Sequence, residues 1–96
     1  MSKIINYRVV LYPAQREGGF VTTKFEIGPG TIYPHLAFQA NSVQAMLGKV
    51  KLFADAHNGG CRASVRCLAP RKPAGFDKAT EGLFFHLDKP PLTVTA

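Results

Sequence analysis

The sequence predicts an α+β fold, in which one main helix packs on one face of an antiparallel β-sheet of about four to five strands. Two observations lead to this fold class. Residues 41–60 have apolar side chains at helical spacing, whereas residues 3–12 and 61–68 alternate between apolar and polar side chains as half-buried strands do. The 96 residues are enough for one hydrophobic core, so we expect residues 1–96 to form a single domain with the element order ββ(β)αββ.

The first two strands are predicted to form a β-hairpin. Residues 3–12 are rich in β-branched and aromatic residues, and residues 13–19 contain a proline and two glycines that favour a turn. Residues 20–27 then return as the second strand. A register that places Arg8 opposite Glu26 is favoured, because like charges that face each other destabilise a sheet.

The remaining strands are predicted from shorter segments. Residues 31–39 are apolar but contain Pro34, so we expect a short, irregular strand at an edge of the sheet. Residues 61–68 show the clearest alternation of the whole chain. Residues 77–82 could form a short helical turn, and residues 82–87 are predicted to be the last strand.

The segment 41–60 is predicted to be a helix of about four to five turns. Asn41 and Gln44 have the spacing of a capping box, and Gly59 and Gly60 can supply the left-handed conformation that ends a helix. One apolar stripe should face the sheet, and it contains Val43, Met46, Leu47, Val50, Phe53, Ala54 and His57.

The charge balance indicates a negatively charged partner. The chain has 12 Lys and Arg residues against 6 acids, a formal net charge of +6, which suits nucleic acid, an acidic protein surface or an anionic membrane, although a merely basic protein would show it too. No apolar run reaches the roughly 20 residues of a membrane span, and the first residues lack the apolar core of a signal peptide. We therefore expect a cytoplasmic protein without membrane contact, and two cysteines fit a reducing compartment.

The sheet face that the helix leaves open is the first candidate binding surface. Arginine pairs with phosphate through its planar fork, and aromatic side chains can stack on bases. Antiparallel sheets also commonly expose one face to water without any function, so that alternative stays open. The candidate residues on this face, or in the loop after residue 68, are Arg8, Tyr12, Phe20, Lys24, Arg62, Arg66, Arg71 and Lys72.

The outer face of the predicted helix is a second candidate surface. Its residues are small or apolar instead of charged, and they are Ala45, Gly48, Leu52 and Ala56. A helix that is apolar on both sides is usually buried on both. Either the C-terminal segment with Phe76 and Phe84 covers this face, or a second subunit or a partner protein does.

No pattern in the chain predicts catalysis, a metal site or a cofactor. Cys61 and Cys67 lie six residues apart on one strand, about 20 Å, which is too far for a disulfide or a shared metal ion. Both are expected to be small core residues. The three histidines match no ligand spacing, and no two acids are spaced for shared acid–base work.

Several turn residues in the first half of the chain resemble those of HicB-type antitoxin domains. The similar segments are YRVVLYP at residues 7–13, EGGFVT at 17–22, GPG at 28–30 and the helix start NSVQA at 41–45. The resemblance implies a hairpin, a Pro-Gly corner, a short strand and a helix. It also implies a toxin-binding or other protein-binding module without enzymatic activity, so no catalytic residue carries over.

These observations together favour a small basic binding protein that is not an enzyme. The first hypothesis is that it contacts the backbone of nucleic acid through the basic sheet face. The alternative is a protein-binding inhibitor or antitoxin-like module, of a kind that phages and mobile elements encode, which docks on an acidic or nucleic-acid-binding partner protein. A homodimer is possible in either case.

Overall fold

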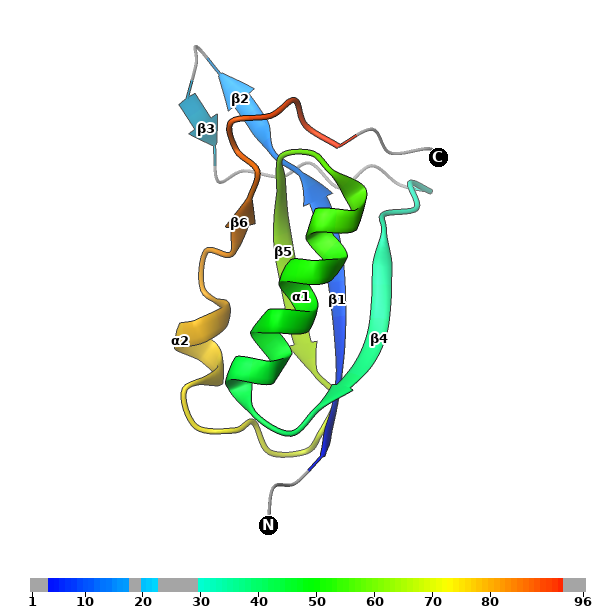
Figure 1. Ribbon diagram of the computed structural model, residues 1–96, viewed down its shortest axis with the longest axis vertical. Helices are drawn as coiled ribbons and strands as arrows, with labels where there is room; N and C mark the ends of the chain where they lie inside the picture. The colour runs from blue at the N-terminus through cyan, green and yellow to red at the C-terminus, as the bar shows by residue number, and fades with distance from the viewer. Residues whose placement is uncertain (1–3, 18–19, 23–29, 93–96) are drawn as a thin grey trace.

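A computed structural model of the chain describes residues 4–17, 20–22 and 30–92, and it describes the side chains of residues 4–15 and 30–92. These residues form two helices and six strands (Figure 1). The elements in chain order are β1 (Ile5–Pro13), β2 (Gln15–Glu17), β3 (Phe20–Thr22), β4 (His35–Ala40), α1 (Val43–His57), β5 (Cys61–Cys67), α2 (Phe76–Thr80) and β6 (Phe84–Phe85).

The main sheet has the strand order β4-β1-β5-β6, and each neighbouring pair is antiparallel. Since β4 and β5 are both antiparallel to β1, they run parallel to each other on its two sides, and α1 connects them as a split βαβ unit. The helix lies across one face of this sheet (Figure 1). The prediction of an α+β fold with one main helix on an antiparallel sheet is therefore confirmed.

The returning strand begins at Phe20 as predicted, but it pairs with residues 15–17, which were predicted to be part of the turn, and its described residues do not pair with residues 3–12. Strand β3 pairs with β2 in a separate two-stranded sheet, and residues 23–29 lie outside the described part of the chain. Both edges of β1 are already used, because β4 pairs with it on one side and β5 on the other. Arg8 therefore has Ala37 and Arg66 as its neighbours, which excludes the register with Glu26.

The core forms between α1 and the sheet, as the alternation of the strands predicts. Tyr7, Val9 and Leu11 of β1 are buried on this side, and so are Cys61 and Ala63 of β5. Tyr7 also stacks on two aromatic rings, with centroid distances of 5.6 Å to Phe38 and 5.8 Å to Phe76. Burial of these apolar side chains is the main stabilisation of the sheet.

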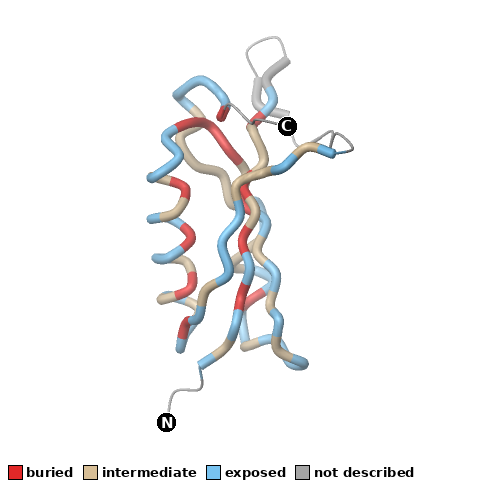
Figure 2. The backbone as a smooth tube through the Cα atoms, turned by 90° about the vertical axis from the view of Figure 1, so that its right-hand side faces the viewer, coloured by how far each residue is buried: buried red, intermediate tan, exposed pale blue. Residues whose placement is uncertain are grey.

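Helix α1 has the predicted stripe but begins and ends on other residues than expected. Met46, Val50 and Ala54 are buried, and Figure 2 shows the buried positions of the helix turned towards the sheet. The N-cap is Ser42, whose Oγ accepts a hydrogen bond from the Ala45 N–H at 3.0 Å, so Asn41 is not the cap.

The C-terminal end of α1 depends on the chain that follows β6. Asn58 adopts the left-handed conformation that ends the helix, with φ of 48°, so the two glycines do not cap it. They are buried because the C-terminal segment packs closely on them: a Cβ on Gly59 would lie 3.0 Å from Leu92. Gly60 N–H donates to the Pro90 carbonyl at 2.9 Å. His57, expected in the stripe, is exposed.

The two ends of the sheet follow the predictions in part. Strand β4 begins directly after Pro34 and is an edge strand, as expected. The predicted strand 82–87 is reduced to the two residues of β6, because His86 has a left-handed φ of 54° that turns the chain away. Helix α2 begins one residue before the predicted helical turn and ends at Thr80.

Candidate nucleic-acid interface

The face of the sheet opposite α1 carries three arginines from the two central strands. Residues that face each other in an antiparallel pair point to the same side of the sheet. Since Tyr7, Val9 and Leu11 point to the core, the alternate residue Arg8 of β1 points away from the helix. The same alternation places Arg62 and Arg66 of β5 on this open face. The side to which each of these arginines points was predicted from the sequence, and the burial pattern of the two strands confirms it.

Arg8 and Arg66 face each other directly across the β1–β5 pair. Their Cα atoms are about 4.5–5.5 Å apart in such a pairing. Both residues are exposed, and among the described residues neither makes an ion pair. The sequences of β1, β4, β5 and β6 contain no acid. Two positive charges are therefore held side by side without a negative partner from these strands.

Arg62 lies at the other end of the open face, among aromatic residues. It faces Tyr12 of β1 on one side and Phe84 of β6 on the other. Tyr12 packs edge-to-face on Tyr33, with a centroid distance of 4.9 Å. Sequence analysis found Tyr12 but missed Tyr33 and Phe84. Phe84 was expected to cover the outer face of the helix, and its position between the alternating apolar residues Leu83 and Phe85 is the signal that could have placed it on the open face.

Two of the remaining basic candidates, Arg71 and Lys72, lie in the loop after β5 and differ in their surroundings. Arg71 is exposed and lines a groove of about 370 Å³, together with Ile5 and neighbouring loop residues. Lys72 pairs with Asp77 at 3.0 Å and lies 5.9 Å above the Phe76 ring. Its charge is therefore directed to α2. The side chains of Phe20 and Lys24 lie outside the described part of the structure.

The outer face of α1 is not covered by the C-terminal segment. Leu52 is 71% exposed, and no atom of the described residues lies within 4 Å of a Cβ built on Gly48. Ala56 is exposed, whereas Ala45 is half-buried against the core. Phe76 is instead buried against Tyr7, which removes the expected intrachain cover.

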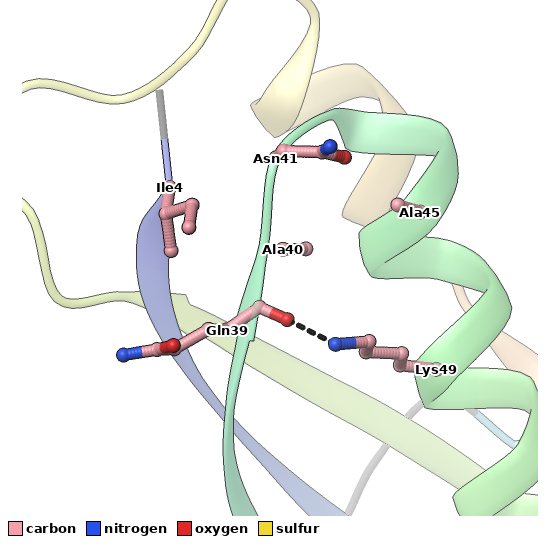
Figure 3. Close-up of a pocket in the computed structure, with 6 residues that line it drawn as sticks. All are labelled: Ile4, Gln39, Ala40, Asn41, Ala45 and Lys49. Atoms are coloured by element: carbon pink, nitrogen blue, oxygen red, sulfur yellow. Dashed lines mark hydrogen bonds between the residues drawn. The ribbon is translucent and has the colours of Figure 1, made fainter. Parts of the chain in front are cut away.

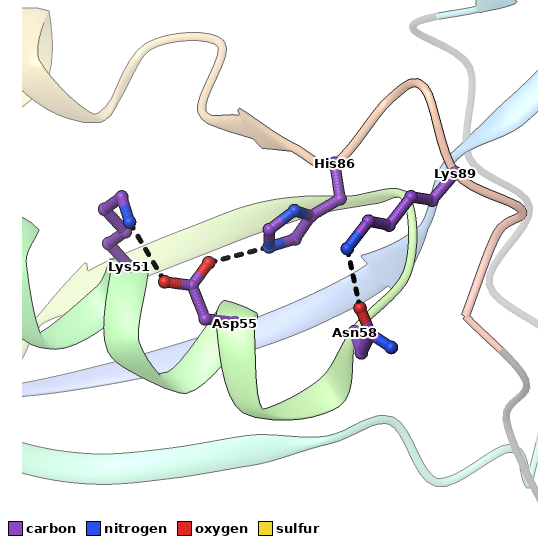
Figure 4. Close-up of polar contacts among 5 residues, drawn as sticks. All are labelled: Lys51, Asp55, Asn58, His86 and Lys89. Atoms are coloured by element: carbon purple, nitrogen blue, oxygen red, sulfur yellow. Dashed lines mark hydrogen bonds and ion pairs between the residues drawn. The ribbon is translucent and has the colours of Figure 1, made fainter.

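A polar cluster fastens the chain after β6 to α1 (Figure 4). Asp55 of α1 contacts His86 Nε2 at 2.7 Å and Lys51 Nζ at 3.0 Å through its two carboxylate oxygens. The hydrogen bond from Lys51, opposed by partial burial and supported by His86, lowers the pKa of Asp55. Lys89 adds a second link by donating to the Asn58 side-chain oxygen at 2.8 Å.

The two cysteines differ in burial, and Cys61 is not accessible as a nucleophile. Both are free, and Cys61 is fully buried. Burial, and secondly the charge of Asp55, raises the pKa of the Cys61 thiol to about 11, so it is protonated at neutral pH. Among the residues that the structure describes, no three His, Cys, Asp or Glu side chains could hold one metal ion.

A second groove of about 270 Å³ lies where β4 meets the first turns of α1 (Figure 3). Lys49 Nζ crosses it and donates a hydrogen bond to the Gln39 carbonyl. The lining residues are Ile4, Gln39, Ala40, Asn41, Ala45 and Lys49. Lys49 is the one charged side chain of this lining, so the groove has no pair of groups for acid–base chemistry.

No protein-family model, no curated protein and no solved structure gives a significant match to this chain. The resemblance to HicB-type antitoxin domains therefore stays a prediction from the turn residues. Within the described ranges, no helix has the length and apolar character needed to cross a membrane.

Proposed function

We propose that this protein binds the phosphate backbone of nucleic acid through the open face of its sheet, without catalysing a reaction. The observation that carries the proposal is the facing pair of Arg8 and Arg66. Like charges in this position destabilise a sheet by a few tenths of a kcal/mol up to about 1 kcal/mol. A phosphate between the two side chains would remove this repulsion and accept hydrogen bonds from both guanidinium groups.

The rest of the open face suits the same ligand. Arg62 adds a third positive charge on β5, and the aromatic residues next to it offer apolar surface that bases can contact. Arg71 extends the basic surface into the loop after β5. The net charge of +6 would attract a polyanion over a longer range.

The direct test measures how tightly two double variants of the protein bind single-stranded and double-stranded oligonucleotides. Arg8→Ala with Arg66→Ala removes both facing charges, and we expect affinity to fall by about 100-fold or more, because each of the two lost contacts to a charged group contributes about 1.5–3 kcal/mol. Lys51→Ala with Lys78→Ala is the matched control, since it removes the same charge from the two helices and should change affinity only slightly. If both variants lost the same affinity, binding would depend on net charge alone and the proposal would be wrong.

A second candidate function is binding to a partner protein, as an inhibitor or an antitoxin-like module. It is supported by the exposed apolar side chain of Leu52 beside the open position at Gly48. Leu52→Glu should then abolish capture of the partner while leaving oligonucleotide affinity unchanged. A host-lysate pulldown with and without nuclease separates the two candidates, because a protein partner survives nuclease treatment.

A further inference from the structure

In the part of the chain that the structure describes, the outer edge of β4 is not paired with another strand. Strand β4 is at one end of the order β4-β1-β5-β6, and Figure 1 shows no other labelled element beyond it. Natural proteins usually protect such an edge with lysine, other charges, proline or a bulge. The six residues of β4 (HLAFQA) include no Lys, Arg, Asp, Glu or Pro.

The register with β1 shows which backbone groups of β4 are free for pairing. Leu11 N–H donates to the Pro34 carbonyl at 2.9 Å, so residues 34, 36, 38 and 40 direct their backbone groups to β1. His35, Ala37 and Gln39 therefore direct theirs to the free edge. The hydrogen bond from Lys49 to the Gln39 carbonyl agrees with this assignment, because it leaves β4 on the side away from β1 (Figure 3).

We propose that a second copy of this chain pairs with this edge, with the two β4 strands antiparallel and the two-fold axis through Ala37. In this register Ala37 of the two copies would exchange both backbone hydrogen bonds, and His35 would do so with Gln39 of the other copy. The Gln39 carbonyl has two lone pairs and can keep Lys49 as a donor.

The occupant is a second copy because the strand is complementary to itself in this register. Leu36, which is 37% exposed, would meet Phe38 of the other copy on the helix side of the sheet. His35 would meet Gln39 on the open side, so apolar side chains face apolar ones and polar ones face polar ones. Neither strand contains a Lys, Arg, Asp or Glu, and the charge at this edge comes from Lys49 of α1, whose ammonium group contacts the Gln39 carbonyl.

The paired strands would join two sheets into one, with both helices on the same side. The open faces would then form one continuous surface that carries Arg8 and Arg66 twice. The two β1 strands would be three strand spacings apart, roughly 14 Å. The dimer does not depend on nucleic-acid binding, and it would double the basic surface if that binding exists.

Ala37→Pro is a sharp test of this interface. The Ala37 N–H is not needed by β1, so proline there should leave the monomer folded, as proline is tolerated at outward positions of edge strands. We expect sedimentation velocity, from micromolar to near-millimolar concentration, to show a dimer of the unmodified chain and a dimer affinity at least about tenfold lower for Ala37→Pro. Ala37→Thr keeps the N–H and should still dimerise.

Cross-linking tests the register independently of the proline variant. In a Cys67→Ser background, Ala37→Cys places two thiols across the two-fold axis with Cα atoms about 5.5 Å apart, within the range of a disulfide. Gln39→Cys places them about four residues apart, roughly 13 Å, and should not cross-link. A monomer at every concentration, or equal cross-linking of both cysteine variants, would overturn the proposal.

Discussion

The two faces of the sheet are made by the same strands, but one face buries apolar side chains and the other exposes charged ones. On the covered face, Val9 and Leu11 have no exposed surface, and the described residues there include no charged side chain that is buried. On the open face, Arg8 and Arg66 stand next to each other without an ion-pair partner among the described residues. The covered face is therefore complete within the chain, whereas the open face has a charge that an external anion would balance.

The comparison also shows which effect decides strand pairing. Burying one Val or Leu side chain stabilises the fold by about 1.5–3 kcal/mol, whereas two facing like charges cost at most about 1 kcal/mol. Pairing β1 with β5 buries several such side chains under α1 at the cost of one arginine pair. The fold thus tolerates a repulsive contact on the face that needs no burial.

The largest expected effect is a difference in stability between substitutions on the two faces of α1. Met46→Ala removes a fully buried side chain, and we expect the free energy of unfolding to fall by about 2–5 kcal/mol. Leu52→Ala, on the exposed side of the same helix, should change it by less than about 0.5 kcal/mol. Urea unfolding of both variants measures the difference, and similar losses would mean that the outer face is covered in solution.

The next effect concerns the Tyr7 hydroxyl, the single buried side-chain nitrogen or oxygen atom that has no hydrogen-bond partner among the described residues. Burial, with a smaller contribution from Cys67, raises the pKa of Tyr7. Tyr7→Phe removes this unsatisfied group and keeps the ring stacking, so we expect the free energy of unfolding to rise by about 1 kcal/mol. A loss of stability instead would reveal a bonding partner, such as a bound water, for this hydroxyl.

A smaller effect is expected from the arginine pair itself. Arg8→Gln or Arg66→Gln should raise the free energy of unfolding by about 0.2–1 kcal/mol, because the repulsion between facing like charges disappears. The gain should shrink at high salt, which screens exposed charges. Arg71→Gln is the control, since Arg71 has no facing charge in a strand pair. No gain, or a gain that is independent of salt, would mean that the repulsion is already relieved.

The smallest effect is the acid dependence that Asp55 contributes. Its pKa is lowered in the folded protein, so its ionised form stabilises the fold above the unfolded-state value of about 3.9. This contribution disappears as pH falls through the lower pKa of the folded state, since the unfolded chain binds the proton more readily. Asp55→Asn should therefore flatten the decline of stability with falling pH in acid, and an unchanged profile would contradict the stabilising contacts of Asp55 with Lys51 and His86.

The sequence was sufficient to predict the faces of the strands but not their neighbours. Alternation along the strands predicted that Arg8 and Arg66 point outward, and helical spacing predicted that Met46 and Val50 point inward. The pairing of β1 with β5 joins residues that are 48 positions apart (Pro13 and Cys61) to 60 positions apart (Tyr7 and Cys67), and no local pattern specifies it. The sequence suggested Glu26 as the neighbour of Arg8 because the repulsion between like charges, a weak effect, can be judged from the sequence. The larger free energy of burying apolar side chains between β1 and β5 cannot be judged before the pairing of the strands is known.

The missed residues are explained mainly by contacts that form only in the folded chain. Asn41 and Ser42 can both cap a helix, and the choice of Ser42 depends on how the chain leaves β4. Phe84 joined the aromatic end of the open face because β6 pairs with β5 at Arg62, another long-range contact. The contact between Asp55 and His86 depends on the left-handed turn at His86, for which a non-glycine residue gives no sequence signal.

The salt dependence of oligonucleotide binding tests the central claim most directly. If Arg8, Arg62 and Arg66 contact phosphates, the logarithm of the binding constant should fall linearly with the logarithm of the salt concentration, with a slope of about −2 to −3. Replacing Arg8 and Arg66 by alanine should reduce the magnitude of the slope by about 1.5–2. Binding without salt dependence, or an unchanged slope in the double variant, would contradict the assignment of the open face as a phosphate-binding surface.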